Sequence, residues 1–476
     1  MKCSNWNLCI AAVISAATTI LALAMLPSET ITYDGALYVD IARSLLRGLT
    51  NYTYQGFYMM YRPPVYVYTL SIVFHFISPG HYLTAARIVS AFFYGLTAGL
   101  AYLFAVELWG DGLKALSASL FYILNPLAFT MGTRELVHSE FTFFYTLSLY
   151  LLYTGRKKGR TGRVYAAFIV AGIAILTRYT GLSIVGVFLV YLYCTEHWGW
   201  VRRREYLIGF ALVLLVLSPW LYMGHVHYGG AFKPFSVASQ YVTGAPPVSA
   251  FDYLGELMGP LGILLLLALL GFVLLGRDDG DWLLTSWFFV GLLGILTVTH
   301  KEARFVTFLS PAIALLASHG LWDSVELLKG ILPRKNLLKY LAILLLLVLL
   351  IPVGRSALAL KAQWDTRGAG YVQALEYAST HYPAKWLLVS PRMYTMAGVY
   401  YPDAVIQVIV DRKQVRERIA AGRYDVIIRM KTDPLLNVES SGMYALAKEF
   451  PLDGIEIYVR APRRIGLNES KPALER

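Results

Sequence analysis

Long apolar runs are the feature of this sequence that most restricts the folds it can adopt. A run of about 18 or more apolar residues can cross a lipid bilayer as a helix, and the chain contains many such runs. Hydrophobic residues make up 57% of the 476 residues and charged residues only 15%, which does not suit a soluble protein of this size. The sequence therefore predicts a polytopic α-helical membrane protein.

Eleven apolar segments are candidates for transmembrane helices. They are residues 8–27, 82–106, 113–129, 138–154, 164–177, 180–194, 206–226, 258–276, 282–299, 304–322 and 338–354. A further apolar stretch, residues 64–78, is too short to span. We expect it to form a surface or re-entrant helix within the first outer loop, residues 28–81.

Clusters of Lys and Arg predict the orientation of these segments. Residues 155–163 contain five positive charges, residues 202–204 contain three, and a third cluster consists of Lys329, Arg334, Lys335 and Lys339. Cytoplasmic loops carry an excess of Lys and Arg, and eleven spans with a cytoplasmic N-terminus place all three clusters inside. The same rule accounts for the net charge of +12 without a nucleic-acid partner.

The composition changes after Arg355. Charged helical stretches then alternate with short β-type runs, at residues 386–390, 405–410, 425–429 and 455–459. This alternation is typical of a small α/β domain, and the expected topology places it on the outer side. We therefore expect a membrane domain over residues 1–355 and an extracytoplasmic α/β domain over residues 356–476.

An amphipathic helix is predicted over residues 32–48, directly after the first apolar segment. Leu37, Ile41 and Leu45 recur at helical spacing, so the helix should lie along the membrane surface. Asp34 stands at its start, where the membrane is expected to end, and is a candidate functional carboxylate. A helix cap is the alternative explanation for Asp34, and a solvated surface charge is the alternative for Asp40.

Other polar residues fall at the same expected membrane face. Two prolines follow Arg62 and fix an extended turn, although snorkelling or a structural salt bridge would also explain this arginine. Glu140 lies inside a predicted helix, where an ionisable group usually faces a cavity or a partner; a buried ion pair is the alternative. Arg134 and Glu135 could pair with each other. Arg178, at an outer turn, can bind an anion bidentately.

The last outer cluster packs four ionisable residues between two apolar segments. Lys301 and Arg304 are candidate phosphate ligands, His300 is a possible donor, and Glu302 could orient one of the cations. A plain solvated loop is the alternative. The sequence contains no P-loop, no dinucleotide-binding glycine fingerprint and no HExxH motif.

The gathering of charges at one membrane face favours an enzyme whose lipid-borne substrate arrives through the membrane. A transporter or flippase of a lipid-linked sugar would more often have broken helices and charges near the bilayer middle, and should show a polar route to both faces. A non-catalytic scaffold would leave Asp34 and residues 300–304 far apart.

Several short motifs resemble one family. They are Asp34 with Tyr38 and Ala42, Arg-Pro-Pro-x-Tyr at 62–66, Asn125-Pro126 followed by Glu140, Leu-Thr-Arg-Tyr-Thr-Gly at 176–181, and His-Lys-Glu-x-Arg-Phe at 300–305. Their order resembles that of the GT-C class of polyprenyl-phosphate-sugar-dependent glycosyltransferases, especially the protein O-mannosyltransferases and lipid A aminoarabinose transferases. The resemblance covers about residues 10–355.

This resemblance implies a GT-C-like fold and an inverting glycosyltransferase. It would take a sugar, such as mannose, another hexose or a pentose, from dolichyl or undecaprenyl phosphate at the outer face. The acceptor would be a protein, a lipid or a glycan. No cofactor follows from the motifs, but two carboxylates could support a divalent cation, so the metal requirement stays open.

The resemblance also assigns roles to residues. Asp34 would be the general base, and Glu140 a second catalytic carboxylate that positions the acceptor or a cation. Arg178, Lys301 and Arg304 would hold the donor phosphate. Tyr38, Arg62, His300 and Glu302 would contact the substrate. The sequence has Glu at position 140, where many members have Asp.

Overall fold

The computed structural model describes residues 5–27, 30–243, 246–331, 335–434 and 438–461. The chain separates into two compact units, Met1–Arg367 and Gly368–Arg476. The first unit extends beyond the boundary expected at residue 355, because helix α15 (Lys335–Thr366) continues without a break to Thr366.

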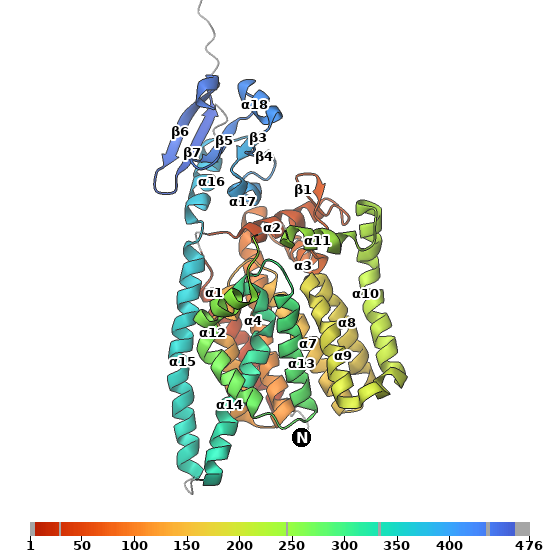
Figure 1. The fold of residues 1–476 in the computed structure, drawn as a ribbon. Coiled ribbons are helices and arrows are strands. Elements are labelled where there is room, and N and C mark those ends of the chain that lie inside the picture. Colours follow the sequence, from red (N-terminus) through yellow and green to blue (C-terminus); the bar gives the residue numbers. More distant parts are fainter. Residues whose placement is uncertain (1–4, 28–29, 244–245, 332–334, 435–437, 462–476) are drawn as a thin grey trace, which may run out of the picture. The chain divides into compact units, whose positions relative to one another are not determined.

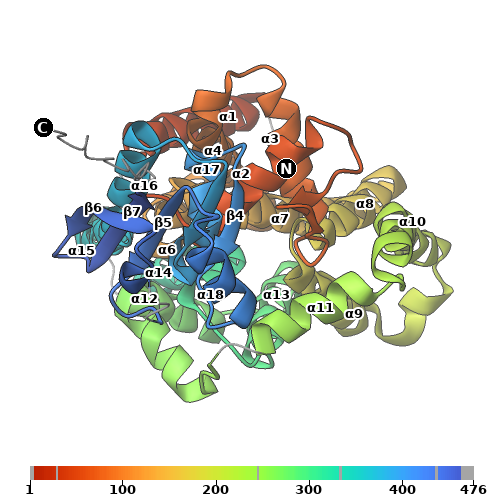
Figure 2. The ribbon, with the colours of Figure 1, turned by 90° about the horizontal axis from the view of Figure 1, so that it is seen from above.

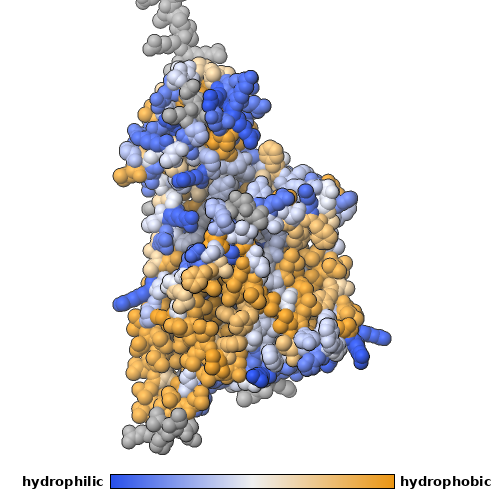
Figure 3. Space-filling model, in the orientation of Figure 1, coloured by the Kyte–Doolittle hydropathy of each residue, from blue (hydrophilic) through white to orange (hydrophobic). Residues whose placement is uncertain are grey.

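Helices dominate the first unit (Figure 1). Among the described residues, eight helical stretches are long and apolar enough to cross a membrane. They contain α1 (Asn5–Ala24), α4 (Tyr82–Trp109), α9 (Ser183–Glu196), α10 (Arg204–Tyr228), α12 (Ala250–Val273), α13 (Asp279–Leu296), α14 (Ser310–Ile331) and α15. Figure 3 shows a broad hydrophobic surface over this unit with hydrophilic residues at its ends. The chain is a multi-pass membrane protein.

Each of the eleven predicted segments overlaps a helix, but a count of eleven spans is not confirmed. Helices α5 (Gly112–Ile123) and α6 (Pro126–Gly132) meet at a bend of 62° and would together make a ninth span. Helix α8 (Thr161–Thr177) has only 17 residues. Helix α7 (His138–Lys157) carries many polar side chains and is largely buried among its neighbours.

Tight helix contacts hold the bundle together. Helix α1 lies along α4, where a Cβ atom on Gly95 or Gly99 would come within 2.5 Å of backbone oxygens of α1. Helices α8, α9 and α10 form one side of the bundle (Figure 2). Helix α7 packs against both α4 and α8, so the polar face of α7 is enclosed by protein.

Short elements cover one end of the bundle (Figure 1). They are α2 (Tyr33–Leu45), the hairpin of β1 (Thr53–Tyr54) and β2 (Phe57–Tyr58), α3 (Pro64–Phe74) and α11 (Lys233–Thr243). The helix predicted over residues 32–48 is confirmed as α2, and the short apolar helix predicted over residues 64–78 is confirmed as α3. The candidate site residues lie on and beneath these elements.

The second unit is an α/β domain, as the sequence predicted. Its sheet has the order β4-β3-β5-β7-β6, formed by β4 (Val405–Val408), β3 (Trp386–Val389), β5 (Val426–Met430), β7 (Ile455–Arg460) and β6 (Tyr444–Phe450). Strand β3 is parallel to β4 and β5, whereas β7 is antiparallel to β5 and β6. The helices are α16 (Ala369–His381), α17 (Tyr394–Tyr400) and α18 (Lys413–Ala420).

Candidate active site

Asp34 lies in the first turn of α2. The residue that caps this helix is Thr32, whose Oγ1 accepts a hydrogen bond from the backbone N of Gly35 at 3.0 Å. The carboxylate of Asp34 is therefore not used as the cap, which removes the simplest structural explanation for an acid at this position. Its side chain is 18% exposed.

Two arginines bracket the Asp34 carboxylate. Arg62 Nη2, from the turn before α3, lies 2.6 Å from Oδ1, and Arg304 Nη1 lies 3.0 Å from Oδ2. Burial by itself would raise the pKa of Asp34, but the two guanidinium groups outweigh burial and hold the pKa well below its usual range. The contact between Asp34 and Arg304 is inconsistent with a scaffold in which these residues lie far apart.

Acidic and aromatic side chains orient the two arginines. Glu302 Oε2 accepts from Arg304 Nε at 2.7 Å, and its Oε1 accepts from Nη2 at 3.1 Å. His300 Nε2 lies 3.4 Å from Glu302 Oε1. The Arg62 guanidinium lies over the ring of Tyr38, 5.6 Å from its centroid. The structure thus brings together five of the predicted site residues with Asp34.

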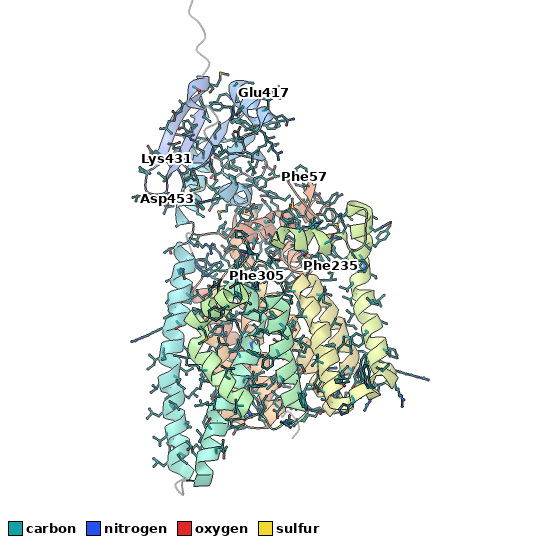
Figure 4. The ribbon with its side chains drawn as sticks, viewed as in Figure 1. Phe57, Phe235, Phe305, Glu417, Lys431 and Asp453 are labelled. Carbon is teal, nitrogen blue, oxygen red and sulfur yellow. The ribbon has the colours of Figure 1, made fainter. Side chains whose placement is uncertain are left out.

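Arg178 approaches the same cluster from the end of α8. Its guanidinium stacks over the ring of Phe305 at 4.7 Å, and that of Arg304 lies 5.8 Å from the same ring. Phe305 lies at the end of the bundle that carries α2 and α11 (Figure 4). His138 Nδ1 lies 2.6 Å from Arg178 Nη1 and must be neutral to accept from it. Burial lowers the pKa of Arg178 to about 10, so the group stays charged at neutral pH.

Lys301 contacts the backbone of Val248 and not the Asp34 cluster. Its ammonium donates to the backbone oxygen of Val248 at 2.7 Å, and the residue is only 6% exposed. His300 Nδ1 lies 2.9 Å from the backbone oxygen of Pro246. Both residues therefore tie the connection between α10 and α12 to this end of the bundle, and Lys301 becomes the weakest of the three candidate phosphate ligands.

Glu140 is buried in the first turn of α7, apart from the Asp34 contacts. Its Oε1 accepts from Thr69 Oγ1 at 2.7 Å, and its Oε2 has no hydrogen-bond partner within the described part of the chain. The contact with Thr69 replaces the ion pair that was one explanation for this residue. Thr69 also lines an apolar cavity of about 420 Å³ between α3, α8 and α10.

Three residues of the site received no role from the sequence. His138 contacts Arg178, the Phe305 ring lies near the guanidinium groups of both Arg178 and Arg304, and Trp364, at the end of α15, has its ring 5.9 Å from Arg304. Phe305 ends the motif at 300–305 but was not assigned to the site. Trp364 was assigned to the second domain, and no sequence pattern links it to residue 304. Over the described ranges, no group of three or more His, Cys, Asp or Glu side chains is placed to hold a metal ion.

Two family models match consecutive parts of the chain. Residues 61–223 match the dolichyl-phosphate-mannose-protein mannosyltransferase family, and residues 250–368 match the Alg9-like mannosyltransferase family. An undecaprenyl phosphate-alpha-4-amino-4-deoxy-L-arabinose arabinosyl transferase of Aeromonas hydrophila is 24% identical over 264 residues, 52% of this chain and 47% of the relative. The chain thus spans about half the length of this relative, and 28% of the length of a second one from Pseudomonas fluorescens.

Solved structures match over nearly the whole chain. ArnT from Cupriavidus metallidurans, bound to undecaprenyl phosphate, superposes with a TM-score of 0.71 at 14% identity, covering 96% of this chain and 98% of that one. The oligosaccharyltransferase AglB from Archaeoglobus fulgidus, in complex with an inhibitory peptide and a dolichol-phosphate, has a TM-score of 0.59 at 12% identity, covering 97% and 75%. The chain therefore has the GT-C-like fold that its motifs predicted.

Proposed function

We propose that this protein is a glycosyltransferase that moves a sugar from a polyprenyl-phosphate carrier to an acceptor hydroxyl at the outer membrane face. The observation that carries the proposal is the partly buried Asp34 carboxylate between Arg62 and Arg304, with Arg178 beside them. A base next to anion-binding groups is what glycosyl transfer from a phosphate requires. The undecaprenyl phosphate in ArnT and the name of the arabinosyl transferase support the choice of carrier.

The reaction is a single displacement at the anomeric carbon. The acceptor oxygen gives its proton to Asp34 and forms the new bond to the sugar. The bond between the anomeric carbon and the phosphate oxygen breaks, and its electron pair leaves with the polyprenyl phosphate. Arginine guanidinium groups stabilise the charge on that leaving phosphate. Attack from the opposite side inverts the anomeric centre.

Arg178 is the best-placed phosphate ligand. Its hydrogen-bond partner is the neutral His138, whereas Arg62 and Arg304 both contact carboxylates. A donor phosphate that binds Arg178 first and then recruits Arg304 would loosen the contact of Arg304 with Asp34. The carboxylate would then be free to act as a base only once the donor is in place.

The decisive test is transfer from labelled polyprenyl-phosphate sugars in purified membranes. The family models name mannose and the relative names aminoarabinose, so the donor panel must contain hexoses and a pentose, each offered with protein and lipid acceptors. Asp34→Asn should lower transfer by about 100-fold or more through loss of the general base. The matched control is Asp40→Asn, on the same helix, which should transfer at the wild-type rate.

Two outcomes would redirect the proposal. Turnover that persists in Asp34→Asn would move the base to Glu140. A wild-type protein that consumes no carrier in the whole panel would favour the transporter, which should instead move a lipid-linked sugar across vesicles without breaking its phosphate bond.

We also propose that the N-terminus is cytoplasmic and the C-terminal unit extracytoplasmic. If α7 and α8 also span, the nine candidate stretches become eleven, an odd number that places the two ends on opposite sides. The basic residues 155–163 and 202–204 then lie inside; of the third basic cluster, Arg334 lies outside the described residues. Impermeant thiol labelling of single cysteines in a cysteine-free chain should modify the C-terminal unit in intact cells and leave residue 159 unlabelled.

A further inference from the structure

A second buried polar cluster lies beside the start of α2. It consists of Arg87 on α4 and of Arg134 and Glu135 in the connection between α6 and α7, and none of the three is more than 4% exposed. Arg87 Nε lies 2.9 Å from Glu135 Oε2. Burial alone would raise the pKa of Glu135, but Arg87 and Arg134 outweigh burial and lower it. Glu135 is therefore ionised at neutral pH.

This cluster holds the chain segment that leads into α2. Arg87 donates to the backbone oxygens of Pro27 and Thr30, Arg134 donates to Thr30 Oγ1, and Glu135 accepts from the backbone N of Thr32 at 2.7 Å. The last contact matters most for the active site, because Thr32 is the residue that caps α2 two positions before Asp34.

Helix α2 also touches Glu135 directly. A Cβ atom on Gly35 would lie 2.2 Å from Cγ of Glu135 and 2.7 Å from its backbone oxygen. Gly35 is therefore required for close approach and not for its backbone angles. The helix turn that carries Asp34 rests against Glu135 on one side and meets Arg62 and Arg304 on the other.

We propose that Glu135 is a positioning residue that holds Asp34 between Arg62 and Arg304 by fixing Thr32 and the first turn of α2. This role rests on the proposed function, in which Asp34 is the base. A shift of the first turn would lengthen both arginine contacts of Asp34. Glu135 itself touches neither the donor nor the acceptor.

Glu135→Gln tests this role. Glutamine keeps the size of the side chain and an oxygen for the backbone N of Thr32, but places an amide NH₂ group or an uncharged oxygen against Arg87. We expect kcat to fall by about 10-fold or more, because Asp34 is no longer held in its catalytic position. KM for the donor should change little, because the residues that bind the donor stay in place. The acidic limb of kcat/KM should move to higher pH by about one to three units as Asp34 loses arginine contact.

The titration of Asp34 can be followed without turnover, and it tests the position of Asp34 independently of activity. The carboxyl band of Asp34 in infrared difference spectra can be assigned by its absence in Asp34→Asn, and then titrated in the wild type and in Glu135→Gln. We expect protonation at higher pH in Glu135→Gln. The matched control is Glu107→Gln, which removes another buried carboxylate, 6% exposed and paired with Lys158. It should leave the Asp34 titration unchanged.

The outcomes distinguish the two proposals. Loss of transfer in Glu135→Gln with an unmoved Asp34 titration would overturn the positioning role. A shifted titration in a protein that transfers no sugar from any carrier would support positioning and overturn the proposed function. If Glu135→Gln does not fold, Gly35→Ala tests the same contact, because its methyl group would push the first turn of α2 away from Glu135. This variant should shift the Asp34 titration in the same direction, and an unmoved titration there would also overturn the role.

Discussion

Asp34 and Asp40 share helix α2 but lie in opposite electrostatic surroundings. Two guanidinium groups contact Asp34. Asp40 is 4% exposed and forms an ion pair with Arg43, whose Nη2 lies 2.5 Å from Asp40 Oδ1. Burial raises the pKa of Asp40 to about 6, and Arg43 offsets only part of this effect. The same helix thus keeps one carboxylate firmly ionised and makes ionisation of the other costly.

Asp40→Asn should stabilise the protein in a pH-dependent way. The folded chain keeps Asp40 protonated up to about pH 6, whereas an unfolded Asp loses its proton near pH 3.9. Stability therefore falls as pH rises through this window and stays lower above it. Asparagine removes this effect, so the variant should unfold at a higher temperature than the wild type at pH 8 and at the same temperature at pH 3. Thermal unfolding in detergent measures both; an equal shift at the two pH values would contradict the explanation.

Substitutions at Arg178 and at Lys301 should affect different properties, donor binding in the first case and stability in the second. Arg178→Met removes the proposed phosphate ligand, so KM for the donor should rise by about 10- to 100-fold, the effect expected from one or two hydrogen bonds between charged groups. Lys301→Met removes the link to Val248, so it should lower the unfolding temperature while changing KM much less. Steady-state kinetics with thermal unfolding of each variant checks this, and equal KM effects would restore Lys301 as a phosphate ligand.

The charged residues around Asp34 were predictable because each interrupts an apolar pattern at the same membrane face. Arg62, Arg304 and Glu302 stand out in this way. Glu135 did not, since its neighbour Arg134 offered a plausible partner, yet its main partner, Arg87, is 48 positions away. Hydropathy gives the depth of a residue in the membrane but not which residues at that depth meet.

At the scale of elements, the bend between α5 and α6 is the main departure from a regular span. Asn125 caps α6, its Oδ1 accepting from the backbone N of Leu127 and of Ala128, both at 3.1 Å. Ser310 Oγ, on α14, lies 3.1 Å from the same oxygen. One amide side chain thus caps α6 and joins its start to α14.

Asn125→Ala should destabilise the protein by about 1–2 kcal/mol, the usual effect of losing a helix cap. Asn125→Asp keeps the accepting oxygen but buries a charge at a site that is fully enclosed, so it should be at least as harmful. Chemical denaturation in mild detergent gives the free energies of unfolding. An alanine variant as stable as the wild type would mean that the prolyl residue at 126 alone maintains the bend.

The sequence predicts where the helices lie along the chain, but it predicts less well which of them cross the membrane. Each of the eleven apolar runs overlaps a helix, because spanning helices must be apolar to dissolve in lipid. The polar face of α7 is shielded by α4 and α8 rather than by lipid. A hydropathy pattern cannot tell lipid from protein as the surrounding medium.

At the scale of the whole molecule, the first unit ends at Arg367, after the last turns of α15. Arg134 Nη2 donates to the backbone oxygen of Trp364 and lies 3.0 Å from Asp365 Oδ1, so the last turns of α15 are bonded to the bundle. The boundary expected at residue 355 would cut α15 before these contacts. The end of the apolar run therefore does not mark the end of the folded unit.

Truncation should reveal this difference. A chain ending at residue 367 should remain folded and monodisperse in detergent, because the first unit keeps its contacts. A chain ending at residue 355 loses Trp364 and Asp365, so the buried Arg134 loses its ion pair with Asp365 and its bond to the Trp364 backbone oxygen. This chain should unfold at a lower temperature by several degrees. Size-exclusion chromatography and thermal unfolding of the two chains test this, and equal behaviour would show that the end of α15 is dispensable.

The charges around Asp34 have a consequence for the choice of carrier. Arg62, Arg178 and Arg304 carry three positive charges against the two negative charges of Asp34 and Glu302, a sum of +1. A phosphodiester-linked sugar brings one negative charge and would leave the whole assembly neutral. A diphosphate-linked sugar would bring at least two negative charges and leave one of them uncompensated in a partly buried site, which is costly. Electroneutrality alone would thus distinguish carriers with one phosphate from carriers with two.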